Sequence, residues 1–314
     1  MDLAESMALL TAAADGDGRI EGRELTGLAL DGARLSGLVF AGGTLSGSFA
    51  GTGFSGCSFE RDSLRGAALA GTTFDGCRFS GEVFSGAKLE GAVFRDCLFE
   101  LPAIRGTLLR KSAFMDCRFA VPCEFQSLDM TSAFFLNVSF GQLLASESVM
   151  DFSSFRNCSF ASLRMVSSQG SGMQLAGLGI ASFAAEGSQL PQAVFMDSSM
   201  PGAVFGDCVL DGATFSGADL SGAAFKGSSA PKAVFAKALL RGADLSGLSA
   251  PFADFSRADL TGARLGGADL SGANLHRAAG FDIRASGLKA EGVRHTDREL
   301  ARAEDFRPFP RGRG

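Results

Sequence analysis

The chain has 314 residues and a net charge of −5, with 42 Gly and 29 Phe but neither Trp nor Tyr. This mild charge argues against a dedicated nucleic-acid binder, which needs a strongly basic face to neutralise phosphates. No apolar run approaches the ~18 residues needed to span a bilayer, and the N-terminal stretch lacks the positive region of a signal peptide. We therefore expect a cytoplasmic protein with no membrane partner and no direct nucleic-acid partner.

The first predicted element is a helix over residues 2–14. The segment that follows it, AADGDGRIEGRE at 13–24, resembles part of an EF-hand calcium loop. Asp15, Asp17 and Glu24 fall at its third, fifth and twelfth positions and are the candidate metal ligands. The first position, normally Asp, is Ala13, so a carboxylate ligand is missing. We favour a Gly-rich turn here and expect no cofactor.

From Leu25 to Leu275, large apolar residues recur at nearly every fifth position, with Ala145, Gly170, Ala185, Ala230 and Ala250 as the exceptions. The register changes twice, by a one-residue deletion before Phe49 and a one-residue insertion near Pro122. Of the 29 Phe, 22 occupy these positions. Small residues commonly stand two positions earlier, and Gly stands two positions later, where a tight turn favours a residue without Cβ. Neither a helix of period 3.6 nor a strand of period 2 produces this pattern, so the chain must turn every five residues.

A longer period of twenty residues overlies the period of five. Four Cys and four Phe form two series with this spacing, which predicts a coil with four sides of five residues each. The eight predicted core residues are Phe54, Phe74, Phe94, Phe114, Cys57, Cys77, Cys97 and Cys117.

The repeats GADLS, GANLH and GARLG within 217–276 resemble those of the pentapeptide-repeat family. The resemblance implies an all-β solenoid, a right-handed quadrilateral parallel β-helix, and its length predicts about 13 coils. We expect an N-terminal helical cap and turn over 1–22, the β-helix over 23–277, and a C-terminal cap, short helix and tail over 278–314. Thr296 and Glu299 form a predicted capping box for a helix over 297–305.

Seven Cys and two His suggest metal or redox chemistry as an alternative. Zinc, however, needs four ligands that converge on one point, whereas a series spaced by one coil places its thiols in a line. Parallel side chains also give poor disulfide geometry. We therefore interpret the thiols as buried core residues in a reducing compartment, and we expect no metal site there. A regular rod offers no deep cleft for acid–base chemistry, so we expect no enzyme activity and no catalytic residue.

Charge is unevenly distributed along the chain. Residues 120–225 carry 9 acidic against 2 basic residues, and residues 226–314 carry 10 against 15. The acidic middle also has apolar residues at outward positions, which suggests a contact surface, with local packing between outward neighbours as the alternative. These candidate partner-binding residues are Phe134, Leu136, Leu144, Val149, Phe152, Val194 and Met196.

The family resemblance implies two kinds of bacterial function. One is a scaffold or adaptor that binds protein partners along the rod, in some cases with a secretion system. The other is protection of DNA gyrase and topoisomerase from inhibitors by dimeric rods whose acidic surface resembles DNA. We favour the first, with a protein partner of unknown identity, and leave a homodimer open as an alternative.

Overall fold

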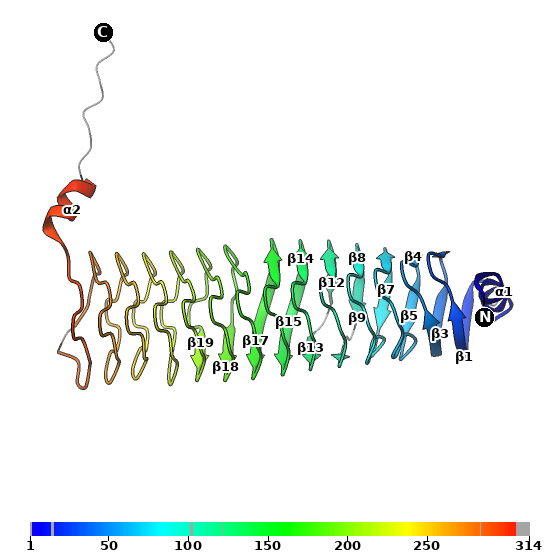
Figure 1. The fold of residues 1–314 in the computed structure, drawn as a ribbon, viewed down its shortest axis with the longest axis horizontal. Helices are drawn as coiled ribbons and strands as arrows, with labels where there is room; N and C mark the ends of the chain where they lie inside the picture. The colour runs from blue at the N-terminus through cyan, green and yellow to red at the C-terminus, as the bar shows by residue number, and fades with distance from the viewer. Residues whose placement is uncertain (1, 14–15, 101–102, 121, 283, 306–314) are drawn as a thin grey trace, which may run out of the picture.

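In the computed structural model, the chain is described over residues 2–13, 16–100, 103–120, 122–282 and 284–305. Figure 1 shows a straight rod of stacked coils, with α1 at the N-terminal end and α2 beside the C-terminal end. Within the described ranges, no helix is long and apolar enough to cross a membrane.

The chain contains two helices and a succession of short strands. The helices are α1 (Leu3–Ala13) and α2 (Arg298–Asp305). The strands are β1 (Arg19–Ala29), β2 (Arg34–Ser36), β3 (Val39–Ser48), β4 (Gly53–Ser55), β5 (Ser58–Glu60), β6 (Thr73–Asp75), β7 (Arg78–Ser80), β8 (Val93–Arg95), β9 (Leu98–Glu100), β10 (Ala103–Arg105), β11 (Ala113–Met115), β12 (Arg118–Phe119), β13 (Cys123–Gln126), β14 (Phe134–Leu136), β15 (Ser139–Ser146), β16 (Ser154–Arg156), β17 (Ser159–Val166), β18 (Phe183–Glu186) and β19 (Val204–Gly206).

The strands pair in parallel, and the chain returns to the same side of the rod after about twenty residues, as between Ser139 and Ser159. Four ladders of such pairs run along the rod, one on each side. We name the sides after the ladders in one coil: side A contains Leu144, side B Val149, side C Ser154 and side D Ser159. Two residues form the corner after each side, so each side with its corner takes five residues. The predicted four-sided parallel β-helix is confirmed.

The number of coils depends on whether strands or single pairs are counted. The main sheet stacks its strands in the order β1-β3-β5-β7-β9-β12-β15-β17-β18-β19, which gives about nine turns, fewer than the 13 expected. Beyond Gly206 the coils lack regular strands and pair through isolated bridges, and the side B ladder continues to Lys289. The coils there keep the twenty-residue spacing, and each side pairs with the same side of the next coil through a single bridge.

Both predicted changes of register occur in the structure. Leu25 pairs with Leu45 at a spacing of 20, but Leu28 pairs with Gly47 at a spacing of 19. Ile104 pairs with Phe125 at a spacing of 21, after which Glu124 and Leu144 return to 20. The ladders therefore tolerate one residue more or less where a turn can absorb it.

Stacked Phe rings fill the centre of the rod. On side C, Phe74, Phe94 and Phe114 stack with ring centroids 4.9 and 4.5 Å apart and nearly parallel planes. The ring spacing matches the spacing between strands, so each ring lies over the same ring of the next coil. This stacking makes the core continuous along the rod. Burial of each such side chain contributes roughly 1.5–3 kcal/mol to stability.

The two ends of the rod differ. The N-terminal helix α1 forms as predicted, and it buries Leu10 against the first coil while the Ser6 hydroxyl accepts a hydrogen bond from the Ala29 amide at 2.9 Å. By contrast, α2 buries none of its own residues. It therefore does not close the core as the expected C-terminal cap would, and half-buried Leu288 and Val293 pack against the core instead.

Candidate functional site

The predicted core residues all lie inside the rod, and none of the eight is more than 2% exposed. The thiols donate hydrogen bonds to backbone carbonyls, for example from Cys77 Sγ to the Phe54 oxygen at 3.5 Å. Burial raises the pKa of Cys123 to about 12 and of Cys158 to about 11. The hydrogen bond to Cys77 and burial likewise raise the pKa of Cys57. These thiols have the surroundings of packing residues, because all seven cysteines are buried, whereas nucleophilic cysteines are at least partly exposed.

The calcium-loop resemblance at 13–24 has little structural support. Asp15 lies outside the described residues. The Asp17 carboxylate accepts a hydrogen bond from the Arg19 amide at 3.2 Å, which closes the turn, and Glu24 lies in β1 opposite Thr44. Over the described ranges, no cluster of three His, Cys, Asp or Glu side chains could hold a metal ion.

The candidate partner-binding residues divide among three sides of the rod. Leu144 lies on side A and Val149 on side B. The other five gather around side C: Phe134 and Val194 lie on the side itself, and the flanking corners carry Phe152, Leu136 and Met196.

Local packing covers part of this surface. The Phe152 ring lies against the bare Cα of Gly172 in the next coil, where an added Cβ would come within 2.9 Å of the ring, yet Phe152 stays 62% exposed. The Arg156 guanidinium lies 6.0 Å from the centroid of the Phe134 ring. Met196 is 41% exposed. The surface is therefore partly self-packed and still presents apolar groups to solvent.

Acidic residues of the middle segment are most frequent on the other two sides. Of the nine acidic residues in 120–225, five lie on sides A and B or on the corner between them, three lie on the corners that flank side C, and one lies on side D. The five are Glu124, Glu147, Glu186, Asp207 and Asp129, the three are Asp151, Asp211 and Asp197, and the one is Asp219.

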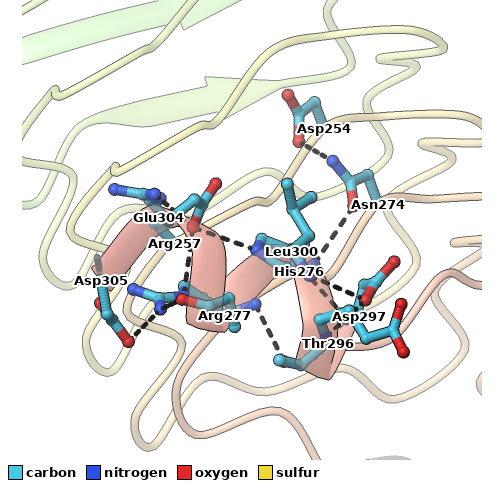
Figure 2. A network of polar contacts seen from close by, with 12 residues as sticks. Asp254, Arg257, Asn274, His276, Arg277, Thr296, Asp297, Leu300, Glu304 and Asp305 are labelled. Atoms are coloured by element: carbon cyan, nitrogen blue, oxygen red, sulfur yellow. Dashed lines mark hydrogen bonds and ion pairs between the residues drawn. The ribbon is translucent and has the colours of Figure 1, made fainter.

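A second cluster, which sequence reasoning missed, lies near the C-terminal end of the rod, on the corner that follows side C (Figure 2). Arg257, His276 and Arg277 project from two successive coils toward Glu304 and Asp305 of α2. Arg257, His276 and Glu304 line an open pocket of about 520 Å³. The twenty-residue spacing of Arg257 and Arg277 was the signal available in the sequence, but it did not reveal that α2 folds back onto them.

The start of α2 also differs from expectation. Asp297, rather than Thr296, is the N-cap, because its carboxylate accepts hydrogen bonds from the amides of Glu299 at 2.9 Å and Leu300 at 3.1 Å. The Thr296 hydroxyl instead accepts a hydrogen bond from the Arg277 amide at 3.0 Å. The predicted Thr296–Glu299 capping box is therefore wrong, and Thr296 joins the linker to the rod.

Fold and surface together define a repeat solenoid with five-residue sides. A family model described as pentapeptide repeats matches residues 48–81, 63–100, 188–227, 218–250 and 253–278, with 8 copies. The chain belongs to the pentapeptide-repeat family.

Among solved structures, the chain is similar to HetL, a pentapeptide repeat protein involved in heterocyst differentiation regulation from the cyanobacterium Nostoc sp. strain PCC 7120. Identity is 18%, the TM-score is 0.38, and 74% of this chain and 89% of that one are covered. It is also similar to QnrB1, a plasmid-mediated fluoroquinolone resistance protein, at 16% identity and a TM-score of 0.36, covering 67% and 100%. A search of curated proteins gives no match.

Proposed function

We propose that this protein is a non-enzymatic scaffold or adaptor that binds a protein partner along side C. The observation that carries the proposal is the clustering of the apolar candidates: five of the seven gather on side C and the corners that flank it, whereas five of the nine acidic residues of 120–225 lie on sides A and B or the corner between them. Apolar groups exposed together on a regular rod are typical of a contact surface, and their burial would supply most of the affinity.

Replacement of Phe134, Leu136 and Met196 by Ser tests this proposal. We expect the triple variant to lose a protein partner that the wild type captures from its native host, with capture largely insensitive to salt. The matched control replaces Leu144 and Val149 by Ser, because these residues have similar exposure but lie on sides A and B. Equal loss in both variants would contradict a role specific to side C.

The acidic face supports a second candidate function. Five of the nine acidic residues in 120–225 lie on sides A and B or on the corner between them, which fits a surface that imitates DNA in an interaction with gyrase. For this function, wild type should inhibit gyrase supercoiling at low salt, and replacement of Glu147, Glu186 and Asp207 by Lys should abolish the inhibition. The side C triple variant should then inhibit as well as wild type. We rank this second, because net charge of the whole chain is only −5.

A further inference from the structure

Three side chains of the rod converge on a single carboxylate oxygen of α2 (Figure 2). Glu304 Oε2 lies 2.5 Å from Arg257 Nη2, 3.2 Å from Arg277 Nε and 3.3 Å from His276 Nε2. The Asp305 carboxylate contacts Arg277 Nη2 at 2.6 Å. Two adjacent residues of one segment thus place both carboxylates in one site, where charge-assisted hydrogen bonds hold them.

The coil geometry explains why these cations point the same way. Lys237, Arg257 and Arg277 occupy the same corner position in successive coils, and all three have a left-handed backbone with φ between 57° and 62°. Their Cα atoms therefore lie in a line, with about 4.8 Å between neighbours. We call these three residues and His276 the cationic corner.

His276 is the buried member of the cationic corner, at 7% exposed. Its Nδ1 accepts a hydrogen bond from the Asp297 amide at 3.2 Å. The proton of a neutral ring is therefore on Nε2, which donates to the Glu304 carboxylate at 3.3 Å. A donor held in this orientation by the backbone favours a carboxylate at that position whichever chain supplies it.

The helix that now supplies the carboxylates is held weakly. None of its residues from Arg298 to Asp305 is buried, and Leu300 is 49% exposed. Besides a hydrogen bond from Arg277 Nη2 to the Ala301 oxygen at 2.5 Å, α2 contacts the rod through the ion pairs of Glu304 and Asp305, and no buried side chain of α2 adds to them. A competing pair of carboxylates could replace it at small cost.

We propose that the cationic corner is a binding site for an acidic segment of a partner protein, and that Glu304 and Asp305 occupy it in cis until the partner displaces α2. Met196 and Lys237 lie on the same corner, two coils apart, so a partner on side C would reach this site. This binding site is separate from the apolar surface of side C, and the proposal does not require that surface to bind a partner. An acidic peptide is favoured over nucleic acid because carboxylates from adjacent residues already fit the site.

The test uses the full chain with Glu304→Gln and Asp305→Asn, which release α2, and a fluorescent peptide with the sequence of residues 297–306, DRELARAEDF. By fluorescence anisotropy, the release variant should bind the peptide about tenfold or more tightly than wild type, a difference of ~1.4 kcal/mol. Adding Arg257→Glu and Arg277→Glu should abolish binding. Adding Lys226→Glu and Lys232→Glu, the same charge change on other corners, should leave it intact.

Equal affinity of the wild type and the release variant for the peptide, or no binding by either, would overturn the proposal. So would retained binding after the Arg257 and Arg277 changes, or tighter binding of a single-stranded oligonucleotide than of the peptide. Arg277→Gln serves if the double reversal does not fold, and it should weaken binding at least severalfold. The Phe134, Leu136 and Met196 triple variant should bind the peptide normally when α2 is released, which separates this test from that of side C.

Discussion

A single inward ring shows how much each repeat contributes to stability. Phe94 is 1% exposed and stacks between Phe74 and Phe114. We expect Phe94→Ala to cost ~3–5 kcal/mol, because the rigid coils above and below cannot collapse into the cavity. Denaturant unfolding would measure the change. The control Phe152→Ala removes a ring that is 62% exposed and should cost less than ~1 kcal/mol. A comparable loss for both variants would contradict the stacked core.

The thiols give a second prediction at this scale. Cys57, Cys77, Cys97 and Cys117 are each at most 2% exposed, so the packed core blocks the access of reagents to all four thiols. We expect Cys57, Cys77, Cys97 and Cys117 to resist alkylation in the native protein and to react fully after denaturation. Mass spectrometry after timed labelling measures this, and rapid native labelling of all four would contradict it.

At the scale of single elements, we expect acid to weaken the attachment of α2 to the rod, because ion pairs hold the helix there. Removal from water raises the pKa of Glu304, but hydrogen bonds from His276 and Arg257 leave it below its usual value. The hydrogen bond from Arg277 lowers the pKa of Asp305. The stabilisation by lowered carboxyl pKa values is complete above their unfolded values, ~4.3 and ~3.9, and is lost as pH falls through the lower folded values.

We therefore expect α2 to leave the rod below about pH 4 while the coils remain folded. The charged and titratable groups that face Glu304 are Arg257, Arg277 and His276 on the rod, with Asp305 beside it on α2. Hydrogen exchange at residues 298–305 would report the release. The matched control is Asp219→Asn, which removes a carboxylate on side D and should leave the pH of release unchanged. Release at the same pH after Glu304→Gln would contradict the role of Glu304.

The whole molecule should behave as a rigid rod in solution. The side B ladder runs from Ala29 through Ser48 to Lys289 in thirteen steps, and at ~4.8 Å a step it extends about 60 Å. Small-angle scattering should give an elongated particle of at least this length, and circular dichroism should show β-structure with a small helical part. A compact particle, or one dominated by helix, would contradict the fold.

The sequence alone was sufficient to predict the core and the coil. Residues such as Phe94 and Cys97 repeat at five and twenty because each inward position meets the same neighbours in the next coil, so packing leaves a periodic record. The two register changes and the buried thiols follow from that pattern, whereas α1 was predicted from the segment that precedes the repeats. The regular strands were harder to delimit, since strands and isolated bridges share the same spacing.

Only the tertiary structure decided which outward residues share a surface. Neighbours in sequence such as Leu144 and Val149 lie on different sides, whereas Phe134 and Val194, sixty residues apart, share side C. The contacts of the cationic corner also depend on α2 folding back, which brings Glu304 to Arg257. No repeat in the sequence predicts this contact. Packing constrains the inward positions in the same way in every coil, so their residues are periodic in the sequence. Outward positions are constrained only by the particular contacts that they make, and these contacts produce no periodic pattern.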